Sequence, residues 1–323
     1  MAELTKTLPA PRTGKKRKSE DIGANTKHGI MSRRSKGDMV FDTINTIFMV
    51  IFTIIILYPL LNMVAVSFND GLDALKGGIT LVPRVFTLKN YETVLGKQSM
   101  FAAARTSVLR TVIGTVTSTL VTALLAYILS RKEFLFKKQL SLLYVVTMYV
   151  SGGLIPIFIV YKNLGLTNSF LVYILPGMVP AFSMLVLRTY MNGLPDSLAE
   201  SAMIDGAGHL TIFIKIIFPL CMPVIATVAL FTAVGQWNSW FDAMLYNKMD
   251  DDLTTLQYEL MKLLSSVTNQ KATAETAQHS TATVTPTSIR AAATVITSLP
   301  IIILYPFLQR YFVAGLTIGG VKE

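Results

Sequence analysis

Residues 40–68 of the chain read VFDTINTIFMVIFTIIILYPLLNMVAVSF. Apolar side chains fill almost the whole stretch, and a helix needs roughly 20 such residues, each advancing about 1.5 Å, to cross a bilayer. Lipid offers the backbone no hydrogen-bond partner, so a segment of this kind must be helical where it crosses. The stretch therefore predicts a retained transmembrane helix and an all-α membrane protein.

Five more apolar runs follow along the chain: Ala104–Leu129, Gln139–Tyr161, Phe170–Leu187, Ile212–Gly235 and Ile289–Leu308. The composition agrees, because 52% of the 323 residues are hydrophobic and only 15% are charged, unlike a soluble domain. Together the runs predict six transmembrane helices in one domain, residues 40–323. The second run is rich in Ser and Thr, which favours close packing on other helices.

The distribution of positive charge predicts the orientation of these helices. Residues 1–39 hold ten Lys or Arg, four acidic residues and no apolar run, so this tail is predicted to be disordered and cytoplasmic. The basic loop 131–138 then also lies inside, and the acidic triplet 250–252 lies outside. Both termini are expected in the cytoplasm. Three longer loops follow the same rule, with 194–211 inside and 69–103 and 236–288 outside.

The chain lacks the residues that catalysis or nucleotide binding would need. The cores of the six runs contain no Asp, Glu or His, on which proton-coupled transporters commonly depend. No Gly-x4-Gly-Lys-Ser/Thr phosphate loop is present, and the single cysteine, Cys221, allows neither a disulfide nor a cysteine metal site within the chain. We therefore expect no catalysis, metal or cofactor. The energy for any transport must come from a partner or from a gradient.

The loop after the fourth run has the local sequence of a short, slim helix. It reads LPDSLAESAMIDGAGH over residues 194–209. Pro195 can open a helix, the acidic residues Asp196 and Glu200 suit its positive N-terminal end, and Gly206 can take the left-handed conformation that ends it. Two interpretations stay open on local physics: a helix that docks in a groove of another protein, or an amphipathic connector at the membrane surface.

The same loop resembles the coupling motif of bacterial ABC importer permeases, which is Glu-Ala-Ala, three residues, Gly, nine residues, Ile-x-Leu-Pro. Here the motif is Glu200-Ser201-Ala202, Gly206 and Ile216-x-Phe218-Pro219, with Ser in place of Ala, Phe in place of Leu, and the spacing intact. The chain is similar to the carbohydrate-uptake branch, of which the maltose transporter permeases are an example. Other stretches that resemble a subgroup for complex oligosaccharides are SGGLIP at 151–156, NLGL at 163–166, QWN at 236–238 and QRYFVAGL at 309–316.

The resemblance implies a type I ABC importer permease fold, with a cytoplasmic coupling helix between the fourth and fifth transmembrane helices. It implies a complex in the bacterial cytoplasmic membrane with a second homologous permease, two cytoplasmic ATPase subunits that bind ATP and magnesium, and an extracytoplasmic solute-binding protein. The implied function is import of a sugar or oligosaccharide by alternating access. The residues implied to contact the ATPase subunits are Glu200, Ser201, Ala202, Asp205, Gly206 and Ala207.

Residues of the sugar path are a separate prediction, because sugar sites need aromatic faces and amide or hydroxyl partners. Four residues near the ends of the runs offer these groups: Tyr149, Trp237, Asn238 and Trp240. Each also has a structural explanation, since interfacial tryptophans commonly anchor helices, a tyrosine can be core and an asparagine can cap a loop.

Two other functions remain open. One is an ABC permease for a solute that is not a sugar, because the coupling motif identifies the ATPase partner and not the cargo. The other is a membrane scaffold that moves nothing.

Overall fold

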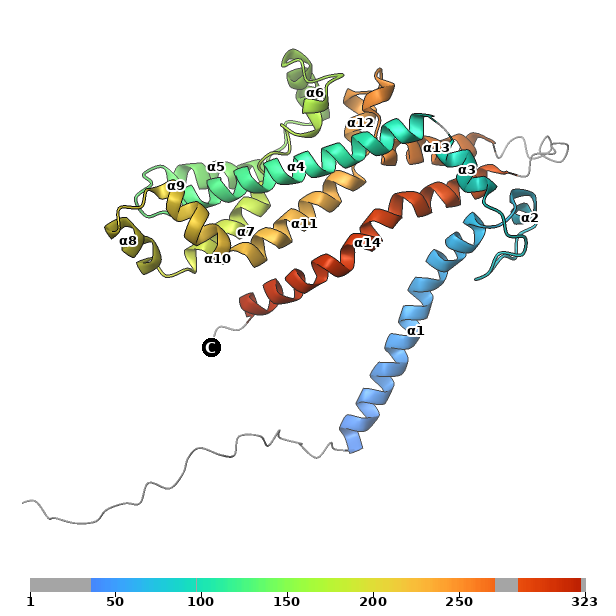
Figure 1. Cartoon of the computed structure of the whole chain (residues 1–323), viewed down its shortest axis with the longest axis horizontal. Coiled ribbons are helices and arrows are strands. Elements are labelled where there is room, and N and C mark those ends of the chain that lie inside the picture. Colours follow the sequence, from blue (N-terminus) through green and yellow to red (C-terminus); the bar gives the residue numbers. More distant parts are fainter. Residues whose placement is uncertain (1–35, 97, 271–283, 321–323) are drawn as a thin grey trace, which may run out of the picture. The chain divides into compact units, whose positions relative to one another are not determined.

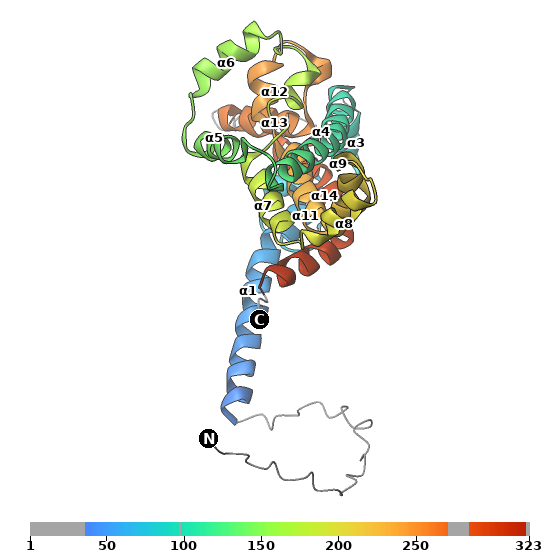
Figure 2. The same ribbon diagram turned by 90° about the vertical axis from the view of Figure 1, so that its left-hand side faces the viewer.

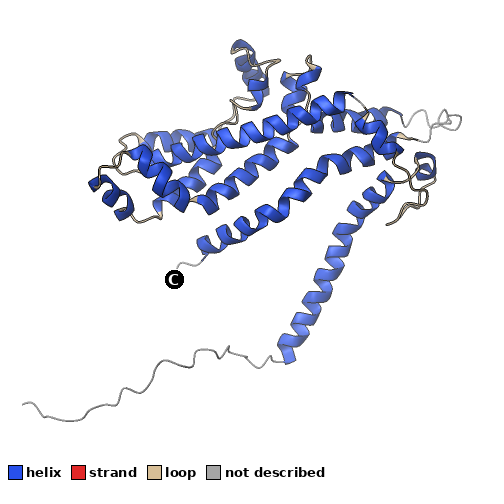
Figure 3. Cartoon of the chain, viewed as in Figure 1, coloured by secondary structure: helices blue, strands red, loops and turns tan. Residues whose placement is uncertain are grey.

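The computed structural model describes residues 36–96, 98–270 and 284–320 of the chain. Figure 3 shows helices and loops over these residues, so the all-α prediction is confirmed. The predicted tail, residues 1–39, lies almost wholly outside the described residues. The chain divides into two compact units, residues 1–57 and 58–323.

Three helices are long and apolar enough to cross a membrane. They are α1 (Lys36–Ser67), α4 (Gln98–Ser130) and α14 (Pro286–Gly320), and they correspond to the first, second and sixth predicted runs. The described part of the first unit consists of the beginning of α1 alone. All other elements belong to the second unit.

The fifth predicted run is helical but sharply bent, so a single straight helix over Ile212–Gly235 was wrong. It consists of α9 (His209–Ile212), the π-helix η2 (Phe213–Ile217), α10 (Phe218–Leu220) and α11 (Met222–Asn238). The two halves meet at an angle of 83° beside Cys221. Pro219 and Pro223 explain the break, because each lies in the first turn of a helix, where its missing N–H costs no bond.

The third and fourth predicted runs are not continuous helices either. The third consists of α5 (Lys137–Tyr149) and α6 (Leu154–Asn163), separated at Gly153, whose φ of +85° no α-helix can contain. The fourth consists of the 3₁₀ turn η1 (Phe170–Tyr173) and α7 (Ala181–Asn192), separated by a segment that contains Pro176 and Pro180. By length and composition the described residues therefore hold three candidate spans, or four if the bent pair counts as one.

The core of the second unit is a bundle in which α4 packs along α7 and α11, and α11 packs along α14 (Figures 1 and 2). Small residues of α4, Ala123 and Ala126, are fully buried against Met184 and Leu187 of α7. The hydroxyl-rich face of α4 also contacts protein, because the Thr122 hydroxyl donates a hydrogen bond to the Met178 carbonyl at 3.3 Å. The prediction that this helix packs closely on others is confirmed.

Short helices occupy both ends of this bundle (Figure 1). One end holds α8 (Ser197–Ile204), next to α9 and α10. The opposite end holds α2 (Gly71–Leu75), α3 (Lys89–Leu95), α12 (Phe241–Tyr246), η3 (Asp251–Leu253) and α13 (Leu256–Gln270). Hydroxyls of α4 fix this second end, since Thr106 donates to the Asp252 carbonyl at 2.8 Å and Ser107 accepts from the Leu256 N–H at 2.8 Å.

Candidate functional site

The predicted coupling segment forms a regular helix, α8, whose beginning is tied to a second loop. Asp196 is the N-cap residue, but its side chain accepts no hydrogen bond from the first turn. It binds Lys132 of the loop between α4 and α5 instead, with 2.5 Å between Nζ and Oδ2. The hydrogen bond from the Lys132 ammonium lowers the pKa of the Asp196 carboxyl. The ion pair thereby joins the loop between α4 and α5 to the loop that contains α8, and both loops are predicted to lie in the cytoplasm.

The end of α8 explains why the motif needs Gly206 four residues after Ala202. Gly206 has a φ of +82°, which confirms the predicted left-handed helix end. Its N–H binds the Met203 carbonyl at 3.0 Å, and the Ala207 N–H binds the Ala202 carbonyl at 2.9 Å. This pair of bonds is the Schellman motif, which favours glycine at the left-handed position and an apolar contact between the two alanine positions.

Only two side chains of α8 hold it against the bundle. Ala199 and Ala202 are buried in an apolar cluster to which α4, α7, α9, η2 and α11 also contribute. Glu200, Ser201 and Asp205 are exposed, and the Ile204 side chain is 86% exposed. The helix therefore presents one continuous face away from its own chain, and the small anchoring residues let it lie close to the bundle.

The four residues predicted for the sugar path are not brought together. Trp237 is buried between α11 and α14, where its indole N–H donates to the Thr297 carbonyl at 2.9 Å. Trp240 is half-buried against η1 and α12. Asn238 is exposed and accepts a hydrogen bond from Gln257, and Tyr149 is 83% exposed at the end of α5. None of the four lines the cavity described next.

A cavity of about 480 Å³ lies among α4, α6, α7, α11 and α12. Three tyrosines and one phenylalanine contribute aromatic walls, and amide, hydroxyl and carboxylate groups contribute polar ones. The lining residues include Arg110, Tyr161, Tyr173, Ser183, Gln236, Asp242 and Tyr246.

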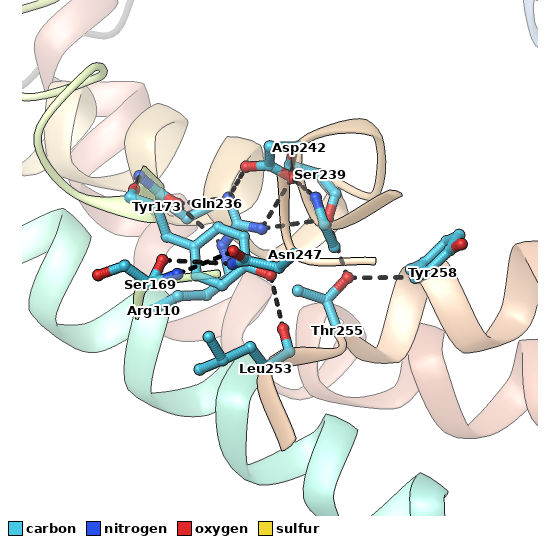
Figure 4. Close-up of polar contacts among 11 residues, drawn as sticks. Arg110, Ser169, Tyr173, Gln236, Ser239, Asp242, Asn247, Leu253, Thr255 and Tyr258 are labelled. Atoms are coloured by element: carbon cyan, nitrogen blue, oxygen red, sulfur yellow. Dashed lines mark hydrogen bonds and ion pairs between the residues drawn. The ribbon is translucent and has the colours of Figure 1, made fainter. Parts of the chain in front are cut away.

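Arg110 organises the polar wall of this cavity (Figure 4). Its side chain is 3% exposed and forms an ion pair with Asp242, with 2.6 Å between Nη2 and Oδ2. It also donates to Gln236 Oε1 from Nε at 3.1 Å and from Nη2 at 2.9 Å. The guanidinium lies 4.3 Å from the centre of the Tyr173 ring, a cation–π distance. One buried cation thus joins α4, η1, α11 and α12.

This network was not predicted from the sequence. The expectation about charges at membrane depth rested on Asp, Glu and His alone. Arg110 lies inside the second apolar run and is the kind of residue that marks function in a membrane. Asp242 lies in a predicted outer loop, so no periodicity connected it to Arg110. An arginine inside an apolar run was the available signal.

Comparison with known proteins identifies the family. Residues 118–318 match the family described as the binding-protein-dependent transport system inner membrane component. The chain belongs to this family. It is therefore a multi-pass inner membrane permease subunit of an ABC transporter and is not itself catalytic.

Individual relatives cover nearly the whole permease. The polygalacturonan/rhamnogalacturonan transport system permease protein YtcP of Bacillus subtilis (strain 168) is 34% identical over 283 residues, which are 88% of this chain and 98% of the relative. The arabinooligosaccharides transport system permease protein AraQ of Halalkalibacterium halodurans is 29% identical and covers 83% of this chain and 92% of the relative. A solved bacterial ABC transporter involved in import of the acidic polysaccharide alginate has a chain with a TM-score of 0.78 and 28% identity, covering 86% of this chain and 98% of that chain.

Proposed function

We propose that this permease moves a sugar or oligosaccharide across the cytoplasmic membrane, driven by ATP hydrolysis on partner subunits. The observation that carries the coupling part is α8, a short helix with an exposed face and a rigid glycine-determined end. The sugar part is supported by the relatives, whose names refer to polygalacturonan, rhamnogalacturonan and arabino-oligosaccharides.

In this proposal α8 docks in a cleft of a cytoplasmic ATPase subunit through Glu200, Ser201, Asp205, Gly206 and Ala207, with Ala202 anchoring it from behind. ATP-driven closure of two such ATPase subunits moves α8 as a rigid lever. The motion passes to the bundle through the apolar cluster in which Ala199 and Ala202 are buried and to which α4, α7, α9, η2 and α11 also contribute. Alternating access follows when the two states of the bundle differ in their contacts with nucleotide-bound ATPases.

The complete importer contains a second homologous permease and an extracytoplasmic binding protein that delivers the sugar. The chain crosses the membrane six times with both termini in the cytoplasm, and the broken third, fourth and fifth segments count as one crossing each. α8 then lies inside, whereas α2, α3, α12 and α13 face the binding protein. The basic loop that holds Lys132 supports this orientation.

The test is ATP hydrolysis by the reconstituted complex in lipid, with the binding protein empty or loaded with members of an oligosaccharide panel. We expect stimulation by at least one loaded form and uptake of the same sugar. An assembled complex that hydrolyses ATP but responds to no sugar would transfer the assignment to another class of solute. A complex that assembles without any ligand-dependent hydrolysis or uptake would favour the scaffold.

A further inference from the structure

We propose that the cavity beside Arg110 is a sugar subsite carried by this subunit itself, and that it accepts an uncharged sugar ring. The inference rests on the proposed function and adds to it a place and a chemical class of ligand. The cavity volume of about 480 Å³ lies within the range of ligand pockets, about 300–1,000 Å³.

The aromatic walls suit the apolar faces of a sugar ring. Tyr161 of α6 and Tyr246 of α12 lie with ring centroids 5.2 Å apart, and Tyr173 lies across the guanidinium of Arg110. Within the part of the chain that the structure describes, the hydroxyls of Tyr161 and Tyr246 have no hydrogen-bond partner. Both rings line the cavity, so these hydroxyls are available to a ligand.

The charge of Arg110 is not available to a ligand. Besides the three bonds to Gln236 and Asp242 given above, Nη1 donates to Asp242 Oδ1 at 3.1 Å and to the Ser239 carbonyl at 3.4 Å. A guanidinium has five N–H donors, and these bonds use all of them. A sugar carboxylate in the cavity would therefore find no free donor on the only guanidinium of its lining.

Asp242 adds a further reason for an uncharged ligand. Its Oδ1 accepts bonds from Arg110, the Ser239 hydroxyl and the Ala243 N–H, whereas Oδ2 accepts one bond among the described residues, from Arg110. The Asp242 side chain is 23% exposed, so Oδ2 can accept a ligand hydroxyl. A uronate at the same place would bring two carboxylates together, which is unfavourable.

Gly114 keeps the polar wall in position. A Cβ atom at this residue would lie 2.9 Å from Nε2 of Gln236, so only glycine leaves room for that side chain beside α4. The Gln236 amide in turn donates to the Tyr173 carbonyl at 3.2 Å. The amide is thus fixed from both sides, as a preorganised sugar site requires.

The test uses cysteine protection in the assembled importer. Cys221 is replaced by alanine, and the Ser183→Cys substitution places a thiol in the cavity wall. The probe is N-ethylmaleimide, applied to nanodiscs that contain the complex, its binding protein and a non-hydrolysable ATP analogue. The binding protein is empty, or loaded with uncharged arabinotriose or with acidic trigalacturonate. The Asn238→Cys variant is the matched control, since Asn238 is exposed at the outer end of α11 and does not line the cavity.

We expect arabinotriose to slow labelling of the Ser183→Cys variant at least fivefold, trigalacturonate to slow it less, and neither sugar to protect the Asn238→Cys variant. Equal or better protection by trigalacturonate, or protection of the Asn238→Cys variant alone, would overturn the proposal. ATP hydrolysis stimulated only by trigalacturonate would overturn the uncharged subsite and leave sugar import intact. If the Ser183→Cys variant fails to assemble, the Thr232→Cys variant, at another cavity-lining residue, replaces it with the same expectations.

Discussion

At the scale of single residues, Arg110 is a buried cation, 3% exposed, that compensates the charge of Asp242. Replacing it by glutamine removes the ion pair and leaves Asp242 uncompensated, which costs about 2–4 kcal/mol for a pair that keeps some solvent contact. We expect the Arg110→Gln variant of the purified complex to unfold at a clearly lower temperature. The matched control is Arg105→Gln on the same helix, where the side chain is exposed and the expected change is small.

The double variant Arg110→Gln/Asp242→Asn separates charge from packing. If loss of the ion pair lowers the unfolding temperature of the Arg110→Gln variant, the second substitution restores part of the lost stability, because no uncompensated carboxylate remains. A double variant that is as unstable as the sum of both single variants would show that the two residues act independently, against the network in Figure 4.

Gly206 and Gly208 provide a second residue-scale prediction. A Cβ atom would meet nothing within 4 Å at either position, but Gly206 has a φ of +82° and Gly208 has a φ of −73°. The Gly206→Ala substitution should therefore cost about 1–2 kcal/mol of backbone strain at the end of α8, and Gly208→Ala very little. We expect a several-fold loss of sugar-stimulated ATP hydrolysis in the first variant only. Equal loss in both variants would contradict a role for the left-handed helix end.

These residues also show what a sequence can reveal at this scale. The left-handed conformation of Gly206 was predicted correctly, because it depends on local sequence and on a spacing from Ala202 that can be counted in the sequence. The contact between Arg110 and Asp242 joins residues 132 positions apart. One of them lies in an apolar run and the other in a predicted loop, so no local rule relates them.

At the scale of elements, the contact between α11 and α14 depends on Trp237. Its indole N–H binds the carbonyl of Thr297, and the Thr297 residue is 1% exposed. The Trp237→Phe substitution removes this buried hydrogen bond between the two helices, at a cost of about 0.5–1.5 kcal/mol. We expect a lower unfolding temperature with unchanged sugar protection of the Ser183→Cys variant. The Trp240→Phe substitution is the control, since no indole hydrogen bond of Trp240 is present among the described residues.

If the Trp237→Phe variant kept its stability but lost sugar-dependent protection, Trp237 would belong to the sugar path, as predicted from the sequence.

The predicted helices themselves were correct for α1, α4 and α14, although α1 contains Pro59 and α14 contains Pro300 and Pro306. They were wrong as continuous helices where Gly153, Pro180 or Pro219 interrupts the run. Hydropathy averages over a run and does not register a single residue that stops the backbone from continuing as a helix.

At the scale of the whole molecule, the number of crossings follows from whether the broken segments traverse the lipid. If α5 and α6 together form one crossing, Lys162 at the end of α6 lies outside while the loop before α5 lies inside. Single cysteines in the Cys221→Ala background can test this with a membrane-impermeant maleimide on intact cells. The chosen positions are Lys162, Leu135 in the basic loop and Met249 before η3, and the last two side chains are 85% and 90% exposed.

We expect the Lys162→Cys and Met249→Cys variants to react in intact cells, and the Leu135→Cys variant to react only after permeabilisation. Labelling of Lys162→Cys only after permeabilisation would make α5 and α6 a re-entrant pair and would remove one of the six crossings. The break at Gly153 permits either path, because a backbone freed from helical geometry must then bury its polar groups in protein or in a water-filled cavity. Lys137 and Lys138 are the first two residues of α5 and mark its beginning as cytoplasmic on either path, so the location of Lys162 decides between the two.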